Sequence, residues 1–220
     1  QEDSWNSELG LRALMGKVFK AEFTLFSMDF KNQIIPVSQS SGNANATGLA
    51  NGGKTRHLGL EAGASFDLAK QMKKNFSFVV AANATWIDSR FNANRFIAVG
   101  ANKVNVKNNL LPYAPSLMLN HSIEFASAKG AGIRLSGNYV GRQFADELNT
   151  VANSADGRIG LLASRYITDL AAFARLSKKQ ILFSLAVKNL TNERYIASRR
   201  PQGIRVGIDR QFVVGMEFKW

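Results

Sequence analysis

Apolar and polar side chains alternate with a period of two along most of this chain. In residues 58–68, Leu58, Leu60 and Phe66 fall on one face, and Glu61 and Ser65 fall on the other. Such alternation is typical of β-strands whose two faces meet different surroundings. The pattern predicts nine strands, at 4–15, 17–30, 58–68, 76–86, 116–125, 133–140, 165–176, 181–188 and 212–220.

Two of these strands are less regular than the others. In 17–30 the apolar side changes from odd positions such as Phe23 to even positions such as Phe26. A β-bulge would explain this change, and we expect one there. The apolar face of 116–125 also carries His121, an unexpected residue for a face in contact with lipid.

The connections between the strands alternate between short and long. Short connections lie around Gly16 and at 69–75, 127–131 and 177–180, and long ones lie at 31–54, 89–115, 143–164 and 192–210. This alternation is typical of outer-membrane barrels, which have short periplasmic turns and long extracellular loops. The fold class predicted is therefore all-β, a transmembrane antiparallel β-barrel. A soluble all-β sandwich is the alternative.

The length of the strands fits the thickness of a membrane. Ten residues at about 3.3 Å each, tilted by ~40°, span roughly 25 Å, which is the height of the apolar band of such barrels. We expect aromatic residues at the two borders of this band, where the predicted girdle consists of Phe76, Trp86, Tyr139 and Trp220.

The number of strands also bears on the organisation of the chain. The last strand would run toward the periplasm, so the first of nine strands would also run toward the periplasm. Complete barrels of this kind have an even number of strands. We therefore expect residues 1–220 to be the C-terminal part of a larger barrel. A complete small barrel, such as a porin or a structural protein, is the alternative.

The composition excludes several other classes of protein. The chain has no cysteine, and no apolar run is long enough for a transmembrane helix. The sequence GLANGGKT at 48–55 matches a phosphate-binding loop, but the strictly alternating residues after it predict a strand and not the required helix. No metal-ligand spacing or catalytic motif is present, so we expect no metal, no cofactor and no enzyme activity. At Asn189–Asn192 the polar residues predict a turn where a strand ends.

The net charge is +12, and it concentrates at the ends of the strands. The long loops hold 14 of the 28 basic residues when the third is counted as 142–165, which includes the arginines at its two borders. Arginine binds carboxylate and phosphate groups through two parallel hydrogen bonds, so an anionic ferric chelate or lipopolysaccharide phosphate would suit these loops. Contacts with neighbouring loops are a third possibility. Nucleic acid is not expected, because the aromatic residues do not alternate with the arginines. The candidate ligand-binding residues are Arg142, Arg165, Arg194, Arg199, Arg200 and Arg205.

The segment VKNLTNERYIASRRPQGIRVG, followed by QFVVGMEFKW, resembles the C-terminal end of TonB-dependent receptors. LPYAPSLMLNHSIEF and GNYVGRQFADELNT resemble the segments that precede this end in the family, and the likeness is closest to ferric-citrate and ferric-siderophore receptors. The resemblance implies a 22-stranded barrel, of which this chain supplies about nine or ten strands. It also implies an N-terminal plug and a TonB box, neither of which is present in these residues, and uptake of an iron chelate across the outer membrane.

The resemblance also gives roles to individual residues. Mixed charges on the polar strand face suit contact with a hydrated plug, and the candidate lumen-facing residues are Glu61, Asn83, Asn120, Arg134, Asn138, Asp169 and Lys188. The C-terminal aromatic residue suits the signal that the barrel-assembly machinery recognises. The residues of this signal would be Val214, Met216, Phe218 and Trp220. Lipid bilayer, lipopolysaccharide, plug, remaining barrel strands and TonB are the other partners implied.

Overall fold

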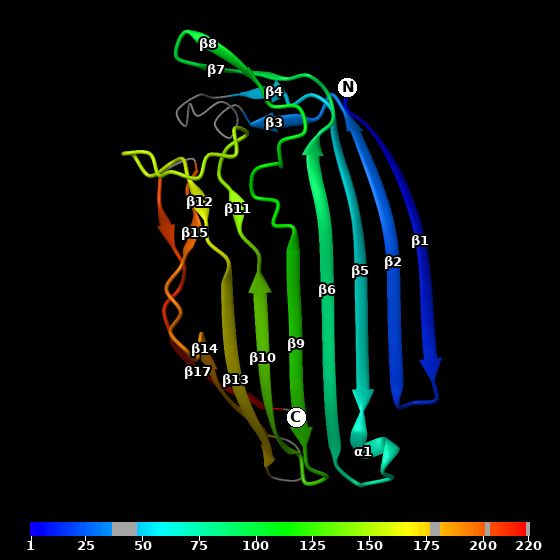
Figure 1. Ribbon diagram of the computed structural model, residues 1–220. Helices are drawn as coiled ribbons and strands as arrows, with labels where there is room; N and C mark the ends of the chain where they lie inside the picture. The colour runs from blue at the N-terminus through cyan, green and yellow to red at the C-terminus, as the bar shows by residue number, and fades with distance from the viewer. Residues whose placement is uncertain (37–47, 177–180, 201–202, 219–220) are drawn as a thin grey trace.

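The computed structural model describes residues 1–36, 48–176, 181–200 and 203–218. Its main feature is a nine-stranded antiparallel sheet in the order β1-β2-β5-β6-β9-β10-β13-β14-β17, in which each strand pairs with the next long strand of the chain (Figure 1). The strands are β1 (Asp3–Met15), β2 (Phe19–Lys31), β5 (Thr55–Asp67), β6 (Ser77–Phe91), β9 (Leu117–Ala126), β10 (Ala131–Val140), β13 (Arg165–Leu176), β14 (Ile181–Lys188) and β17 (Gln211–Phe218). The nine predicted strands are confirmed. Trp220, at the end of the last one, lies outside the described residues.

The predicted bulge in the second strand is wrong. β2 pairs with β1 and with β5 in an unbroken register, from Phe19 opposite Met15 and Phe66 to Phe30 opposite Ser4 and Thr55. Phe26 therefore lies on the same face as Gly59, directly opposite it, and its ring covers that glycine. The inner face of the sheet, which carries Glu61, becomes apolar near the loops. The apolar residues of β2 change sides for this reason, and not because the backbone shifts.

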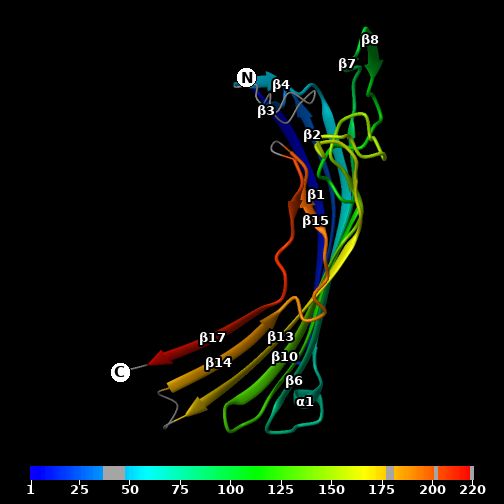
Figure 2. The same ribbon diagram turned by 90° about the vertical axis from the view of Figure 1, so that its left-hand side faces the viewer.

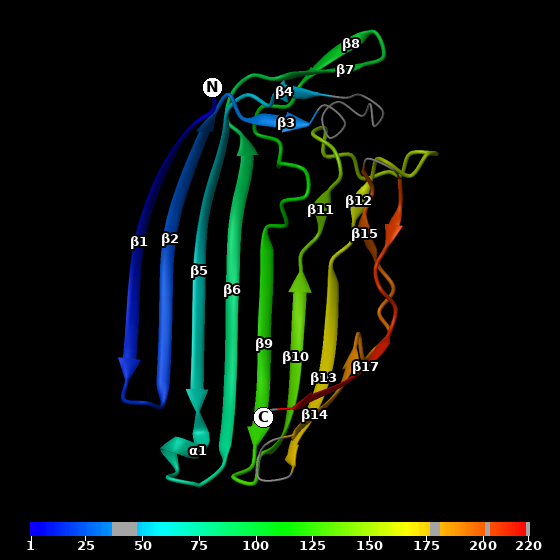
Figure 3. The ribbon, with the colours of Figure 1, turned by 180° about the vertical axis from the view of Figure 1, so that it is seen from behind.

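The two ends of the sheet differ, as the loop lengths predicted. The long connections lie at one end and the short turns lie at the other (Figures 1 and 3). Within the long connections the chain forms two-stranded pieces that the sequence did not predict. These are β3 (Ile34–Pro36) with β4 (Leu49–Asn51), β7 (Phe96–Val99) with β8 (Asn102–Asn105), β11 (Gln143–Phe144) with β12 (Leu161–Leu162), and β15 (Ile196–Ser198) with β16 (Arg205–Val206).

One short turn contains a single turn of helix, α1 (Leu68–Gln71), which was not predicted. The Asp67 carboxylate accepts a hydrogen bond of 3.1 Å from the backbone N–H of Lys70, which satisfies one free donor of the first turn. Phe76 lies just before β6 and not within it, because the chain is still leaving this turn. Among the described residues, no helix is long and apolar enough to cross a membrane.

The sheet is one bent layer whose outer apolar face is uncovered (Figure 2). Leu9, Leu58, Val80, Leu185 and Val214 lie on this face and are all exposed. A soluble sandwich would bury these side chains against a second sheet. The apolar cluster of the described residues lies instead among the loops and consists of Phe91, Ile97, Val106, Leu111 and Leu148.

Candidate functional site: the polar inner face and the loop end of the sheet

Three asparagines form a hydrogen-bonded row across the inner face of the sheet. Asn120 on β9 donates to the Asn83 oxygen on β6 at 3.0 Å, and Asn138 on β10 donates to the Asn120 oxygen at 2.6 Å. The row forms because the register places these three residues directly opposite one another. Asn120, in the middle of the row, uses both its amide donor and its amide acceptor, as Asn chemistry allows.

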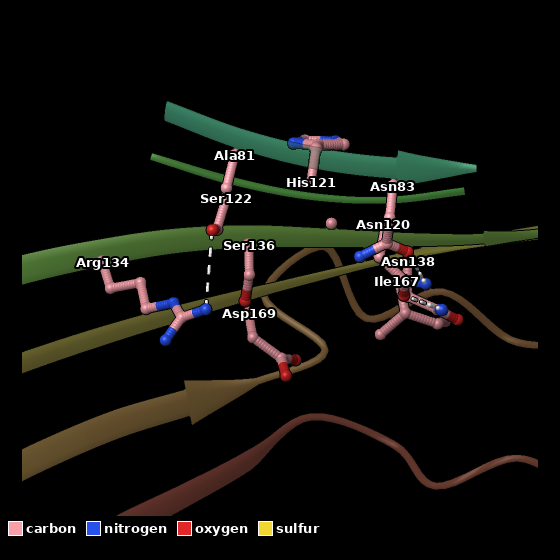
Figure 4. A pocket seen from close by; sticks show the side chains of 11 residues that line it. Ala81, Asn83, Asn120, His121, Ser122, Arg134, Ser136, Asn138, Ile167 and Asp169 are labelled. Carbon is pink, nitrogen blue, oxygen red and sulfur yellow. Dashed lines mark hydrogen bonds between the residues drawn. The ribbon is translucent and has the colours of Figure 1, made fainter. Parts of the chain in front are cut away.

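The asparagine row and side chains beside it, among them Arg134, Ser122 and Asp169, line a cavity of about 380 Å³ (Figure 4). Arg134 lies 3.8 Å from the Glu124 carboxylate, and its guanidinium donates weakly to Ser122 at 3.5 Å. Asp169 lies on β13, opposite Ser136 of β10. Figure 4 shows these polar groups on one side of the sheet, while His121 lies on the other side. The predicted lumen-facing residues Asn83, Asn120, Arg134, Asn138 and Asp169 are therefore brought together.

Asp169 also links the sheet to the last loop. Its Oδ2 atom accepts from the Lys188 ammonium at 2.9 Å, and its Oδ1 atom accepts from the Asn189 backbone N–H at 2.9 Å. Two predicted lumen residues, Asp169 and Lys188, thus form an ion pair with each other. Glu61, another of them, lies opposite Thr24 and Thr85 on the same face and is exposed.

The predicted turn after β14 is confirmed. Asn189 and Asn192 have positive φ angles of 51° and 55°, which Asn tolerates better than most residues. The Asn189 side chain accepts from the Glu193 N–H at 2.8 Å and donates to the carbonyl groups of Glu193 and Ile208 at 3.0 Å each. One buried side chain therefore fixes both ends of the last loop.

Tyr113 connects two of the long loops, 89–115 and 192–210. Its hydroxyl oxygen accepts from the backbone N–H groups of Arg199, at 3.2 Å, and of Arg200, at 2.9 Å. Tyr113 itself has a φ of 57°, a rare conformation for a bulky residue. Surrounding contacts must maintain such a conformation against its local cost.

The side chain of Arg199 is fully enclosed by the loop before β13. It is 2% exposed, and its guanidinium donates to the carbonyl groups of Gly157 at 3.0 Å and Leu161 at 3.3 Å, and to the Asn153 amide oxygen at 2.8 Å. These bonds use Nη1 and Nη2, whereas the buried Nε has no hydrogen-bond partner among the described residues. Hydrogen bonds to the terminal nitrogens offset much of the cost of burying the charge. Arg199 therefore joins two loops.

Arg200 and Arg95 lie on the two sides of one buried carboxylate. The distances to Glu147 are 3.8 Å from Arg200 and 3.6 Å from Arg95, and Glu147 is 3% exposed. Arg95 also donates to the Gly52 carbonyl group and lies 5.3 Å from the Phe91 ring centroid. This group connects the loops around residues 52, 95, 147 and 200.

A second arginine–aromatic contact lies at the start of β13. The Arg165 guanidinium lies 4.8 Å from the centre of the Tyr195 ring, a distance typical of cation–π contacts. A Cβ at position 207 would overlap the Tyr195 ring, so glycine is required there. Arg165 is half-buried and lies on the same face of β13 as Asp169.

The six candidate ligand-binding arginines thus lie in different surroundings. Arg199 and Arg200 are buried, and Arg165 is half-buried on Tyr195. The others, Arg142, Arg194 and Arg205, are exposed. The six side chains are chemically identical, and they differ only in their exposure and in the residues that surround them.

The predicted girdle and assembly-signal residues mostly lie on the outer face. Trp86 is 47% exposed and lies in one row with Leu60 and Leu117. Tyr139 lies opposite Leu119 and Tyr166, and Phe76 packs against Phe125 with ring centroids 5.5 Å apart. The assembly-signal residues Val214, Met216 and Phe218 are exposed in one row of β17.

Several residues that hold the loops together were not predicted from the sequence. Tyr113, Arg95, Glu147 and Asn149 are the main ones. Asn149 forms a two-way bond with Leu110, accepting from its N–H and donating to its carbonyl group at 2.8 Å each. No periodic pattern marks these residues, because their partners lie in distant segments of the chain. Among the described residues, no group of three or more His, Cys, Asp or Glu side chains could hold a metal ion.

Comparisons with known proteins agree with this architecture. A family model described as "TonB dependent receptor-like, beta-barrel" matches residues 1–190. The unliganded ferric citrate transporter FecA is 24% identical, with a TM-score of 0.73 over 97% of this chain and 31% of FecA. The ferric yersiniabactin uptake receptor FyuA from Yersinia pestis is 20% identical, with a TM-score of 0.72 over 99% of this chain and 30% of FyuA.

A third structure extends the same likeness. The siderophore receptor PiuA from Acinetobacter baumannii is 16% identical, with a TM-score of 0.73 over 99% of this chain and 28% of PiuA. The chain therefore spans less than a third of each of these three proteins. At these identities the structures show a shared fold, and the family match covers most of the chain. This chain belongs to the family of TonB-dependent receptor β-barrels.

Proposed function

We propose that this chain is part of an outer-membrane active transporter that takes up a ferric siderophore or a similar iron chelate. The observation that carries the proposal is the membership of the receptor family together with a sheet that is apolar outside and polar inside. The transporter is located in the outer membrane of a Gram-negative bacterium, and TonB supplies the energy of transport. No catalytic role is part of this proposal.

The names of similar structures support an iron chelate as the substrate. FecA, FyuA and PiuA are described as a ferric citrate transporter, a ferric yersiniabactin receptor and a siderophore receptor. One similar structure is described as a copper transporter, with a TM-score of 0.70. Copper is therefore the substrate against which the iron proposal must be tested.

We further propose that residues 1–220 form the C-terminal part of a larger barrel with a plug in its lumen. β1 and β17 are the two edges of the sheet, and each pairs with one strand. An open apolar edge of this length favours pairing with further strands. The inner face, with its asparagine row and its Arg134 and Asp169 side chains, offers hydrogen-bonding groups of both charges to a hydrated plug.

We propose that only the more exposed of the six predicted arginines bind the chelate directly. Arg142, Arg194 and Arg205 have free side-chain surface at the loop end, and Arg165 presents its guanidinium on the Tyr195 ring. Guanidinium groups match anionic oxygens through parallel hydrogen bonds. Arg199 and Arg200 would act indirectly by fixing the loops that carry these residues.

The test is growth of a strain that lacks the whole protein on single sources of iron. The proposal predicts loss of growth on one ferric chelate, and restoration by the intact gene but not by a gene without its TonB-coupling segment. Arg142→Gln with Arg194→Gln should weaken binding of that chelate, whereas Arg175→Gln, exposed at the opposite end of β13, should not. Unchanged growth on every iron source, with a defect in copper uptake, would contradict the iron proposal.

The alternative is a complete small barrel that acts as a passive pore. The apolar outer face and polar inner face would suit that function equally well. The transporter and the pore differ in their need for energy, because a pore conducts without TonB. Uptake that persists after removal of TonB would favour the pore.

A further inference from the structure

Exposed lysines occupy each of the three short turns that the structure describes. Lys17 lies between β1 and β2, Lys70, Lys73 and Lys74 lie between β5 and β6, and Lys129 lies between β9 and β10. Residues 16–18, 68–76 and 127–130, which form these turns, include no aspartate, glutamate or arginine. The fourth short turn, 177–180, lies outside the described residues. The turn end of the sheet is therefore basic, and the cations of its described turns are all lysines.

Four of these lysines have no anionic partner among the described residues. Lys70 alone pairs with a carboxylate, because its Nζ atom lies 3.0 Å from the Oδ2 atom of Asp67, which is 6% exposed. The loop end differs, since Arg56, Arg90 and Arg95 each lie within 3.6 Å of a carboxylate oxygen. Much of the positive charge at the loop end is thus neutralised within the protein, whereas the charge at the turn end is left for an external partner.

The turn between β5 and β6 holds its three lysines on an ordered backbone. The Met72 N–H donates to the Leu68 carbonyl group at 3.0 Å, and the Lys74 N–H donates to the Ala69 carbonyl group at 2.9 Å. Ala69 is fully buried, and the Asp67 carboxylate caps α1. This turn is therefore a fixed protrusion, and its lysine side chains are exposed around it.

The three turns follow one another along the same end of the sheet (Figures 1 and 3). The strand order β1-β2-β5-β6-β9-β10 places successive turns two strands apart. At about 4.8 Å between strands, neighbouring turns are roughly 10 Å apart, and the three together extend over roughly 20 Å. Salt screens exposed charges beyond about 8 Å, so each turn needs an anion in contact with it. A matching partner must therefore repeat its anionic groups along an extended chain.

The choice of lysine indicates how that anion is held. Arginine presents a planar fork that suits an anion in one fixed orientation, whereas the lysine ammonium is a compact point charge with rotatable donors on a flexible stem. Lysine can therefore follow carboxylates whose positions vary along a flexible polymer. The long loops, in contrast, carry mainly arginine.

We propose that the turn lysines bind the carboxylate-bearing polymer of the periplasm, the peptide-linked glycan of the cell wall. This proposal rests on the proposed membrane-spanning function, because short turns of outer-membrane barrels lie in the periplasm. The peptides of this polymer carry free carboxylates at repeated positions in an extended network, which is the arrangement that the three turns require. Such binding ties the protein to the cell wall and uses neither its loops nor its inner face.

The experiment measures how strongly the whole protein that contains this chain binds purified cell-wall sacculi. The protein is inserted into nanodiscs of zwitterionic lipid and sedimented with the sacculi at low salt. The test variant combines Lys73→Gln, Lys74→Gln and Lys129→Gln, and it keeps the ion pair of Lys70 with Asp67. We expect its affinity for sacculi to fall by about tenfold, which is about twofold for each exposed charge pair lost.

The matched control removes the same charge from the opposite end of the sheet. Lys54→Gln, Lys103→Gln and Lys107→Gln are combined in it, at three exposed positions of the long loops, and this variant should bind sacculi like the parent protein. Sacculi whose carboxylates have been amidated should bind the parent protein as weakly as untreated sacculi bind the test variant. Added salt should also weaken binding by the parent protein, because exposed charge pairs are screened.

Three results would overturn the proposal. The first is equal binding of sacculi by the parent protein and the test variant, and the second is unchanged binding of the parent protein to amidated sacculi. The third is loss of binding when the nanodiscs also contain an anionic lipid, because the lysines would then bind lipid headgroups instead. Failure of the parent protein to insert into nanodiscs would overturn the membrane-spanning function and this proposal with it, whereas insertion without binding to sacculi would overturn this proposal alone.

Discussion

The Tyr113 hydroxyl oxygen accepts a hydrogen bond of 3.2 Å from the Arg199 backbone N–H, although 86 positions separate the two residues in the chain. The same oxygen accepts from the Arg200 N–H at 2.9 Å. Both arginines are buried, and buried N–H groups require an acceptor. One phenolic oxygen thus holds the last loop against the loop before β9.

Replacing Tyr113 by Phe should loosen the last loop without unfolding the sheet. The change removes the acceptor of two buried amides, and each unsatisfied buried group costs about 1–3 kcal/mol. We expect amide hydrogen exchange at Arg199 and Arg200 to accelerate by tenfold or more. Tyr166→Phe, which removes a hydroxyl from the outer face, is the control and should leave this exchange unchanged. Slow exchange in Tyr113→Phe would contradict the role of the hydroxyl.

Replacing Arg199 by Lys should destabilise the loop before β13. Lys keeps the charge but cannot reach the Gly157 and Leu161 carbonyl groups and the Asn153 amide together. The expected cost is about 1–3 kcal/mol, from the lost hydrogen bonds. Limited proteolysis of residues 153–161 is the measurement. Arg205→Lys, at an exposed position, should behave like the parent protein.

Replacing Asn149 by Asp should break half of its two-way bond with Leu110. The carboxylate can still accept from the Leu110 N–H, but it can no longer donate to the Leu110 carbonyl group. Two oxygen atoms then face each other, and we expect a loss of about 1–3 kcal/mol. Hydrogen exchange around residues 109–111 should rise, because loop 89–115 loses this contact. Equal exchange in both proteins would show that the amide donor contributes nothing.

Replacing Gly137 by Ala should destabilise the outer face. The Nε2 atom of His121 lies 2.6 Å from the Tyr166 hydroxyl oxygen, and the two side chains meet above Gly137. An added Cβ would overlap both of them, and crowding of this kind costs about 1–3 kcal/mol. Unfolding in denaturant is the measurement. Gly63→Ala is the matched control, because its nearest neighbour would lie 3.5 Å away.

The turn around Asp156 should depend on pH. The hydrogen bond from the Ser154 hydroxyl, at 2.6 Å, followed by that from the Arg158 N–H, lowers the pKa of the Asp156 carboxyl group. Because the folded pKa is depressed, the contribution to stability is present above the ordinary range of Asp and is lost as the pH falls through the folded value. NMR titration should show this low pKa in the parent protein and a pKa closer to the ordinary value in Ser154→Ala. Equal pKa values in both proteins would contradict the assigned cause.

The sequence by itself determined the strands, their two faces and the ends at which the loops lie. These features follow from a side-chain period of two and from turn residues such as Asn189, and both are local properties of the chain. The bulge predicted in the second strand was wrong, because β2 keeps an unbroken register on both sides. A change of apolar side can reflect a change of surroundings, as at Phe26 above Gly59, as well as a bulge.

The tertiary structure alone decided which arginines are free and which are enclosed. Arg194 and Arg199 belong to one segment and have the same chemistry, but Arg194 is exposed and Arg199 is surrounded by carbonyl groups from residues about 40 positions earlier. The contact between Tyr113 and Arg199 likewise depends on loops that meet after the sheet has formed. Hydrogen bonds between distant segments leave no periodic signal, because their partners are chosen by the folded path of the backbone and not by neighbouring residues.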